Sequence, residues 1–436
     1  MTGLHLSKIG NKMTNKVGVR AIMHDIQEVL NSDPNQYVNL SAGNPAILPQ
    51  VYEMWEEALR DIVNDKQLKN LISQYGSSYG THELIDCIRE YFFTNYRIKL
   101  DREQVLITSG SQNLFFLALN SFCGTSKEGR VKKALIPMLP DYAGYSGVAL
   151  EEGVIEGIPP ILSKLDRHTF RYEFNKQAFK GKIAQDPDIG AVVLSRPNNP
   201  SGNILSEEAV HFISQVCKDY HIPLLIDSAY APPFPAINFI EMDPIIQDNI
   251  IHCMSLSKAG LPGERIGIAI GKSEFIKVME AFQSNILIHS SRLGQRMVAS
   301  TLKSGQLAGI SADYIRTHYK QKHDYLKNLL TTRMPDDIPW YLHKAEGSLF
   351  GWLWLEGLPF SDSDLYNRLK AENLIVVPGG SFFHGSQSSS HNRECIRISL
   401  TATDEDLKKG IDILSSVVKE IYSSNFIFQT EKIEFL

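Results

Sequence analysis

Residues 250–270 read IIHCMSLSKAGLPGERIGIAI, with a short apolar run on each side of a turn that contains glycine and proline. Apolar runs without polar alternation are typical of strands that are buried on both faces of a sheet. Similar runs occur upstream at residues 105–108, 134–138, 191–195 and 224–227, and apolar residues at helical spacing separate some of them. This alternation predicts an α/β fold with a largely parallel sheet flanked by helices.

Beyond residue 305 the pattern of elements changes. The expected elements are strands at residues 349–355, 374–377 and 395–400, and helices at residues 364–370 and 407–421. Such a mixture indicates a smaller α+β unit. A chain of 436 residues is too long for one ordinary core, which favours two domains.

The composition indicates a globular protein that binds small molecules. Hydrophobic residues make up 43% of the chain, charged residues 21%, and the net charge is −5. No basic run suggests a nucleic-acid surface, and no apolar run suits a signal peptide or a membrane span. We therefore expect a cytoplasmic protein without nucleic-acid or membrane partners. The five cysteines are scattered, which argues against a disulfide framework and against zinc, so no metal site is predicted.

The turn within residues 250–270 carries a lysine in a setting that suits covalent chemistry. Lys258 follows a predicted buried strand, and the carboxyl ends of such strands border the ligand crevice of α/β sheets. Desolvation and a nearby cation would lower the pKa of its amine and make it a better nucleophile. Ser255, Ser257 and Arg265 offer hydroxyls and a planar guanidinium to a phosphate. The alternative is an ordinary loop with a solvated lysine.

A carboxylate ends another predicted strand. The apolar residues 224–226 run directly into Asp227, and a buried carboxylate needs a partner. A protonated pyridine nitrogen would serve, because holding it protonated makes an aromatic cofactor ring an electron sink. The alternative is an aspartate that caps a helix. Tyr230 could donate to a phenolate oxygen of such a ring, or it could be a core aromatic.

Two more strand ends carry small and polar residues. Residues 195–202 (SRPNNPSG) follow an apolar run, and by themselves they are an ordinary turn. Residues 108–112 (TSGSQ) lie between a predicted strand and a predicted helix. Backbone N–H groups at such a helix N-terminus could reach a phosphate, although many strand–helix turns look similar.

In this order, the four segments resemble the fold-type-I pyridoxal-phosphate aminotransferases. Asn-Pro-x-Gly begins at Asn199, Asp-x-x-Tyr begins at Asp227, and Ser-x-Ser-Lys ends at Lys258. The similarity extends from Gly43 to Arg397. The segments GRVKKALIPMLPDYAGY, SRPNNPSGN, DSAYAPPFP and SLSKAGLPGERIG look most like the valine–pyruvate aminotransferase branch.

The resemblance implies a division of the chain and a cofactor. A large domain of residues 46–305 would carry a mostly parallel, seven-stranded type of sheet and bind pyridoxal 5′-phosphate. Residues 1–45 and 306–436 would form a smaller α+β domain.

The resemblance also implies a role for each candidate residue. Lys258 would be the Schiff-base lysine and the general acid/base, and Asp227 would pair with the pyridine nitrogen. Other expected cofactor contacts are Tyr230 and Asn199 at the 3′ oxygen, Tyr142 against the ring, Gly110, Ser111, Ser255, Ser257 and Arg265 at the phosphate, and Gln112.

The remaining roles concern the substrate and a second subunit. Arg397 would bind the α-carboxylate of the substrate as a bidentate fork, helped by Gly43 and Asn199. Tyr75 would reach the phosphate of a neighbouring subunit, which implies a homodimer with shared active sites. For Tyr75 and Tyr142, a place in the hydrophobic core is the alternative.

The implied reaction is transamination between a small aliphatic amino acid, such as valine or alanine, and a 2-oxo acid such as pyruvate. The lysine motif also permits elimination, decarboxylation or cyclisation of a polar amino acid on the same cofactor. A non-enzymatic cofactor-sensing regulator is disfavoured, because no helix-turn-helix pattern precedes Gly43 and the pI is about 6.2.

One segment departs from the branch. Residues 285–295 (NILIHSSRLGQ) carry His289 and Arg292, where small or apolar residues are expected. A cation there could recognise an acidic or polar substrate side chain. A structural or inter-subunit salt bridge is the alternative.

Overall fold

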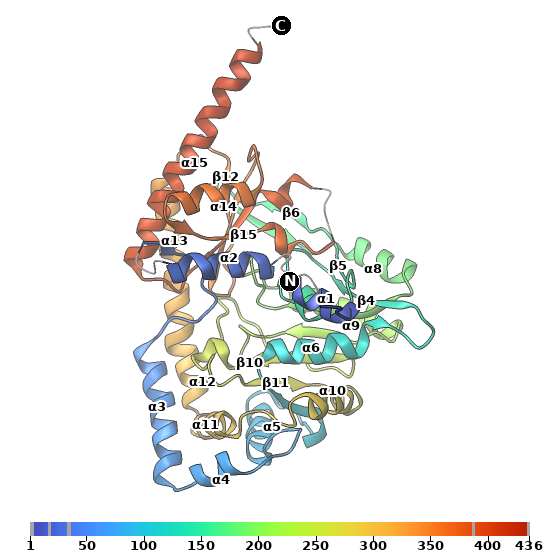
Figure 1. The fold of residues 1–436 in the computed structure, drawn as a ribbon. Helices are drawn as coiled ribbons and strands as arrows, with labels where there is room; N and C mark the ends of the chain where they lie inside the picture. Colours follow the sequence, from blue (N-terminus) through green and yellow to red (C-terminus); the bar gives the residue numbers. More distant parts are fainter. Residues whose placement is uncertain (1–3, 16–18, 33–35, 386–388, 434–436) are drawn as a thin grey trace.

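The computed structural model describes residues 4–15, 19–32, 36–385 and 389–433, and a mixed eight-stranded sheet forms its centre (Figure 1). The strand order is β2-β11-β10-β9-β8-β4-β3, and β5 also pairs with β4. The strands are β2 (Val105–Thr108), β3 (Gly124–Thr125), β4 (Val131–Ile136), β5 (Ile155–Gly157), β8 (Ile189–Ser195), β9 (Leu224–Asp227), β10 (Ile250–Ser255) and β11 (Gly267–Ile270).

Parallel pairing joins the middle of this sheet. β10, β9, β8 and β4 form consecutive parallel pairs, and β5 runs parallel to β4. β11 is antiparallel to both β10 and β2, and β3 is antiparallel to β4. β2, β9, β10 and β11 are buried along their whole length, as their continuous apolar sequences predict. The predicted α/β class with a mostly parallel sheet is therefore confirmed.

The chain also forms helices, several of which cover the sheet or link its strands. They are α1 (Lys8–Thr14), α2 (Val19–Ser32), α3 (Pro49–Asn64), α4 (Leu68–Ser73), α5 (His82–Tyr96), α6 (Ser111–Phe122), α7 (Tyr145–Val148), α8 (Lys176–Gln185), α9 (Glu207–Asp219), α10 (Ser273–Ile286), α11 (Arg292–Lys303), α12 (Gln306–Ile310), α13 (Arg316–Arg333), α14 (Asp362–Ala371) and α15 (Asp404–Ile433). α6 packs on β10 and β11, whereas α5 and α10 pack beside β2.

A second sheet of six strands has the order β15-β16-β13-β12-β7-β6. Its strands are β6 (Ile161–Lys164), β7 (Thr169–Glu173), β12 (Trp340–His343), β13 (Phe350–Leu355), β15 (Val377–Pro378) and β16 (Cys395–Ser399). β6 and β7 come from within residues 46–305, yet β7 pairs with β12, which lies beyond residue 305.

The N-terminal part of the chain also contacts the C-terminal part. β1 (Val38–Asn39) pairs in parallel with β14 (Leu374–Ile375). This pairing agrees with the idea that the two ends of the chain belong together, but the division at residues 45 and 305 stays a prediction.

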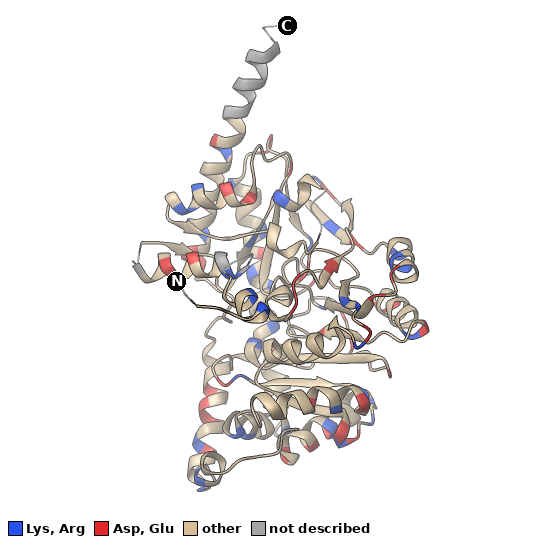
Figure 2. Cartoon of the chain, turned by 45° about the vertical axis from the view of Figure 1, so that its right-hand side comes forward, with Lys and Arg blue, Asp and Glu red and all other residues tan. Residues whose placement is uncertain are grey.

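Charged residues of both signs are interspersed along the peripheral helices (Figure 2). The mixture agrees with the small net charge of −5. In this view, residues of one charge sign do not gather into a large patch. Among the described helices, none is both long and apolar enough to cross a membrane.

Candidate active site

A cavity of about 290 Å³ lies at the carboxyl ends of β8, β9 and β10. The predicted site residues that line it are Gly43, Ser111, Gln112, Tyr142, Asn199, Asp227, Tyr230, Ser255, Ser257, Lys258, Arg265 and Arg397. Gly110 and Tyr75 are the predicted residues outside this lining. Six further lining residues were not singled out in the sequence, and they are Met23, Ala143, Ala229, Phe350, Val377 and Phe382.

Lys258 lies in a short 3₁₀ turn (Ser257–Ala259) directly after β10. Its Nζ donates to the carbonyl oxygen of Gly43 at 2.7 Å. Burial, together with the charges of Arg397 and Arg265, lowers the pKa of Lys258 to about 8. The lysine is thus partly buried at the cavity and has a more easily released proton, as its sequence context predicts, and the solvated-loop alternative is wrong.

The turn that carries Lys258 is braced from α3. Trp55 Nε1 donates to the carbonyl of Ala259 at 2.9 Å. The next residue, Gly260, has a φ of +86°, and a Cβ there would collide with Val51. A glycine is therefore required at this position, because it permits the left-handed turn and the close approach of α3.

Asp227 is the last residue of β9 and is 7% exposed. Its Oδ1 accepts from the backbone N–H of Ala229 at 3.1 Å, and its Oδ2 accepts from the hydroxyl of Tyr145 at 3.2 Å. Burial raises the pKa of Asp227 to about 7, against the lowering effect of these donors and of Lys258. Residues 228–249 contain turns and bends but no helix, so the helix-cap alternative is wrong.

Arg397 in β16 is 6% exposed, and not all of its N–H groups are paired. Its Nη1 donates to Asn199 Oδ1 at 3.0 Å, and its Nη2 donates to the carbonyl of Ser41 at 3.3 Å. Its Nε is buried and has no hydrogen-bond partner among the described residues. The guanidinium lies 3.9 Å from the ring centroid of Phe350, which favours the charged form. An incoming carboxylate would satisfy the unpaired N–H.

A cradle for an anion forms where β2 meets α6. Gly110 precedes α6 with a φ of +83°, and a Cβ at this position would collide with the guanidinium of Arg265. Arg265 Nη1 also donates to Ser257 Oγ at 3.2 Å. Backbone donors of a helix N-terminus, a guanidinium and a hydroxyl thus come together, and this donor set suits a phosphate.

His289 and Arg292 lie outside the cavity lining of their own chain. Arg292 Nη1 donates to the carbonyls of Asn70 and Gln74 at 2.8 and 3.0 Å. The ring of His289 meets the ring of Tyr75 edge-on at 5.9 Å. Tyr75 is 82% exposed, so it is not a core aromatic. Arg292 therefore makes a structural contact with backbone carbonyls, and it forms no salt bridge with the residues that the structure describes.

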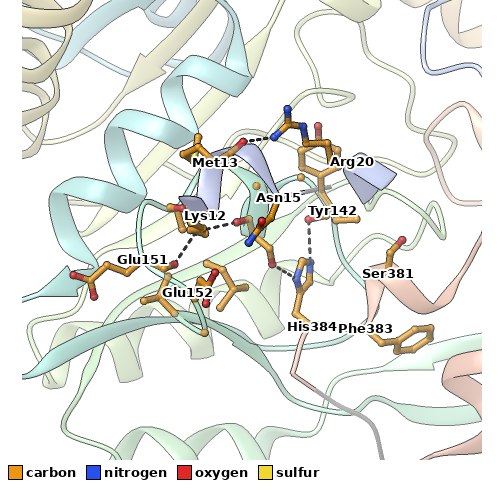
Figure 3. Close-up of a pocket in the computed structure, with 18 of the residues that line it drawn as sticks. Lys12, Met13, Asn15, Arg20, Tyr142, Glu151, Glu152, Ser381, Phe383 and His384 are labelled. Atoms are coloured by element: carbon orange, nitrogen blue, oxygen red, sulfur yellow. Dashed lines mark hydrogen bonds between the residues drawn. The ribbon is translucent and has the colours of Figure 1, made fainter. Parts of the chain in front are cut away.

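A larger hollow of about 740 Å³ adjoins the cavity and shares Gln112, Tyr142 and Ala143 with it (Figure 3). α1 lines this hollow. Lys12 Nζ donates to the carbonyls of Ala149 and of Glu151, the latter at 2.8 Å. The N-terminal helix thus forms part of the wall outside the cavity, which its sequence did not suggest.

The cavity fits pyridoxal phosphate on three counts. It offers an anion cradle, a lysine whose pKa is lowered, and a buried carboxylate that receives hydrogen bonds only from two uncharged donors among the described residues. A cationic ring nitrogen would give this carboxylate an opposite charge.

The family model of aminotransferase class I and II matches residues 35–414. The chain belongs to this family. It is a pyridoxal-phosphate-dependent aminotransferase, and the resemblance found in the sequence is confirmed.

Three similar aminotransferases match almost the whole length of this chain. Valine–pyruvate aminotransferase of Escherichia coli is 30% identical over 96% of this chain and 99% of its own length. A crystal structure from Psychrobacter arcticum, described as an amino-acid aminotransferase, has a TM-score of 0.93 and 33% identity, and covers 97% of this chain and 100% of its own. Valine–pyruvate aminotransferase from Salmonella typhimurium has a TM-score of 0.83 and 28% identity, with 92% and 99% covered.

Sequence reasoning missed Asp141, which is 1% exposed. Its carboxylate accepts from the backbone N–H of Tyr142 at 2.6 Å, from the backbone N–H of Ser195 at 3.0 Å, and from the Ser195 hydroxyl. Ser195 Oγ in turn accepts from the backbone N–H of Asn199 at 3.2 Å. Asp141 therefore connects the loop of Tyr142 with the loop of Asn199. A carboxylate one residue before an aromatic in PDYAGY was the available signal.

Asp141→Asn is expected to lower the free energy of unfolding by about 1–3 kcal/mol, because an amide NH₂ would face donors where an acceptor is needed. Urea denaturation of the enzyme measures this loss. Ser195→Ala removes one of the same donors and should cost less. An Asp141→Asn enzyme as stable as wild type would contradict the linking role of this carboxylate.

Proposed function

We propose that this aminotransferase moves an amino group between a small aliphatic amino acid, such as valine or alanine, and a 2-oxo acid such as pyruvate. The charged side chains that line the cavity are Asp227, Lys258, Arg265 and Arg397. All four have roles toward the cofactor or the α-carboxylate in this proposal. The substrate side chain is then left with the apolar residues Met23, Phe350, Val377 and Phe382. This lining is the observation that carries the proposal, and the names of the two valine–pyruvate relatives support it.

The roles proposed for the residues follow from their chemistry. Lys258 would hold the cofactor through its aldehyde and would carry a proton to and from the substrate α-carbon. Asp227 would pair with the ring nitrogen, and Arg397 would bind the α-carboxylate with Asn199 and the loop at Gly43. Bound pyridoxal phosphate would supply an electron sink for the charge that develops at the α-carbon.

The remaining cofactor contacts belong to the same proposal. Tyr230 and Asn199 would contact the 3′ oxygen, and Tyr142 would stack on the ring. Gly110, Ser111, Ser255, Ser257 and Arg265 would hold the phosphate, with Gln112 beside it. Tyr142 donates its hydroxyl to Gln112 Oε1 at 3.0 Å, which fixes both side chains at the cavity wall.

A survey of amino donors tests the substrate class. Single-turnover absorbance changes are measured with valine, alanine, glutamate and arginine, and 2-oxo acid consumption is compared with amino acid formation. We expect valine and alanine to react fastest, with one-for-one exchange against pyruvate. If glutamate or arginine outruns valine tenfold, the valine assignment is wrong and the aminotransferase class remains. Unequal consumption and formation would favour elimination, decarboxylation or cyclisation instead.

Arg292→Ala should change stability but not the ranking of amino donors. The loss of its two bonds to the carbonyls of Asn70 and Gln74 is expected to lower the free energy of unfolding by about 1 kcal/mol. The same donor survey, run on this variant, checks the ranking. A wild-type preference for an acidic donor that disappears in Arg292→Ala would show that this cation recognises the substrate.

We propose that the enzyme is a homodimer with shared sites. Tyr75 and Ile72 are exposed on one segment, and Ile286 and Ile288 are exposed on another. Contacts of His289 and Arg292 tie the two segments together. Exposed apolar side chains that are held close together are typical of interfaces. We propose that a second copy covers them and that Tyr75 reaches the phosphate cradle of that copy.

Sedimentation of the active enzyme at micromolar concentration should therefore show a dimer. Ile288→Asp should shift the equilibrium toward monomer, because it places a charge in the contact. Ile161→Asp, at an exposed isoleucine of β6, is the control and should leave the dimer intact. An active wild-type monomer would contradict the shared-site proposal.

A further inference from the structure

Tyr145 is a fully buried tyrosine beside the cavity, and neither the sequence motifs nor the roles proposed above account for it. It begins α7, and its hydroxyl donates to Asp227 Oδ2 at 3.2 Å. Its ring packs against Phe115 at 5.0 Å and edge-on against Tyr142 at 5.3 Å. Tyr145 is absent from the cavity lining, and its hydroxyl acts on the site through Asp227.

His384 contacts one residue on either side of Tyr145. Its Nε2 lies 3.1 Å from the carbonyl oxygen of Tyr142, and its Nδ1 lies 2.9 Å from Ser146 Oγ (Figure 3). Burial lowers the pKa of His384 to about 4, so the ring is neutral. It then donates to the carbonyl and accepts from the serine hydroxyl. The imidazole also stacks on the ring of Tyr145 at 6.3 Å, so the phenol is held from several sides.

The hydroxyl of Tyr145 remains a donor at every working pH. Burial raises the pKa of Tyr145 well above its ordinary value, so the phenol stays neutral. Its hydrogen bond lowers the pKa of Asp227, which burial raises. Without this bond Asp227 would keep one donor, the N–H of Ala229, and would hold its proton more tightly.

Other titratable groups also act on Asp227. Those in electrostatic contact with it are Lys258, Asp141, Tyr142, Tyr230 and Cys253. On the neighbouring strand β10, His252 is instead bonded to Ser228 and to the carbonyl of Ile245. Among the described residues, Tyr145 is the side chain that forms a hydrogen bond with Asp227.

We infer that Tyr145 is a positioning residue that holds Asp227 ionised and oriented toward the ring nitrogen of the cofactor. This inference rests on the role proposed for Asp227. Tyr145 does not line the cavity, and the effect of its hydroxyl passes through the carboxylate. A protonated Asp227 would lose its attraction for a cationic nitrogen.

The test compares two ligands that differ at the ring nitrogen. Tyr145→Phe removes one hydroxyl and keeps the ring that packs on Phe115. Affinities of the full chain are measured, after removal of bound cofactor, for pyridoxal phosphate and for its 1-deaza analogue, in which a C–H group replaces the nitrogen. Quenching of tryptophan fluorescence follows the binding. We expect Tyr145→Phe to lower the affinity for pyridoxal phosphate by about tenfold and to leave the affinity for the analogue unchanged.

A matched control is available in the second sheet. Tyr172 is also fully buried, and its hydroxyl accepts from Trp352 Nε1 at 2.7 Å. Tyr172→Phe should leave both affinities unchanged. In an Asp227→Asn background, Tyr145→Phe should cause no further loss, because its partner is already neutral.

Two results would show a merely structural role and overturn the inference. One is an equal loss of affinity for both ligands, and the other is a full further loss of affinity for pyridoxal phosphate when Tyr145→Phe is added to Asp227→Asn. Unchanged affinity for both ligands would overturn it too. If the wild-type chain bound the two ligands equally, the pairing of Asp227 with the nitrogen would itself be wrong, and the failure would lie in the proposed function.

Discussion

Lys258→Ala is expected to abolish transamination, with turnover falling by several orders of magnitude. The substitution removes both the amine that would bond the cofactor and the group that would move the α-proton, and no second lysine lines the cavity of the described chain. Turnover with valine and pyruvate measures the loss. Borohydride reduction of the wild-type enzyme, followed by peptide mapping, should place the cofactor label on Lys258.

Lys272→Ala is a suitable control, because this lysine forms a surface ion pair with Glu274. It should retain full turnover. The rate at which the cofactor-free wild-type enzyme binds added cofactor covalently should also depend on pH. The neutral amine is the nucleophile, and the pKa of Lys258 is lowered to about 8, so the rate should rise with pH through about 8 and then level off. A label on any other lysine would contradict the assignment.

Asp227→Asn is expected to slow the half-reaction with valine by orders of magnitude while the protein still folds. A neutral amide cannot stabilise a protonated ring nitrogen, yet it fills the same space, and its one oxygen can still accept the hydrogen bond of either Tyr145 or Ala229. Stopped-flow absorbance measures the rate. Asp186→Asn, at an aspartate paired with Lys182 and Lys133, is the control. A near-normal rate in Asp227→Asn would contradict the role of this carboxylate.

The same variant has a readout in stability. The pKa of Asp227 in the folded, cofactor-free chain is raised to about 7, above the ordinary value of ~3.9 for an unfolded chain. Between these pH values the folded chain keeps a proton that the unfolded chain has released. The contribution of Asp227 to stability is therefore fully present at low pH and is lost as pH rises through about 7. Asp227→Asn should remove this part of the pH dependence in urea denaturation.

The sequence could predict that the site residues lie close together, because several of them follow directly on the ends of predicted strands. Asp227 and Ser255 end β9 and β10, and Asn199 follows the end of β8. Carboxyl ends of parallel strands meet at one edge of a sheet, so residues far apart in the chain come together there. The apolar runs that define these strands are local signals, and a single sequence shows them directly.

The rest of the site depends on packing between distant segments, which local patterns do not encode. Met23 belongs to the N-terminal helix α2 and Phe350 to the second sheet, and both look like ordinary apolar residues. Tyr145 also resembles a core aromatic, since its hydrogen bond to Asp227 appears only once α7 has been placed beside β9. The strand pattern of β6 and β7 likewise does not reveal which sheet they join.

The placement of β6 and β7 means that the two sheets cannot be separated by a single cut of the chain. Residues 161–173 join the six-stranded sheet, although strands of the eight-stranded sheet lie before and after them in the sequence. A fragment of residues 46–305 would carry this hairpin without β12, leaving an open strand edge that invites aggregation. Neither sheet is therefore complete in a single contiguous segment, so the two sheets cannot be expressed or exchanged as separate fragments.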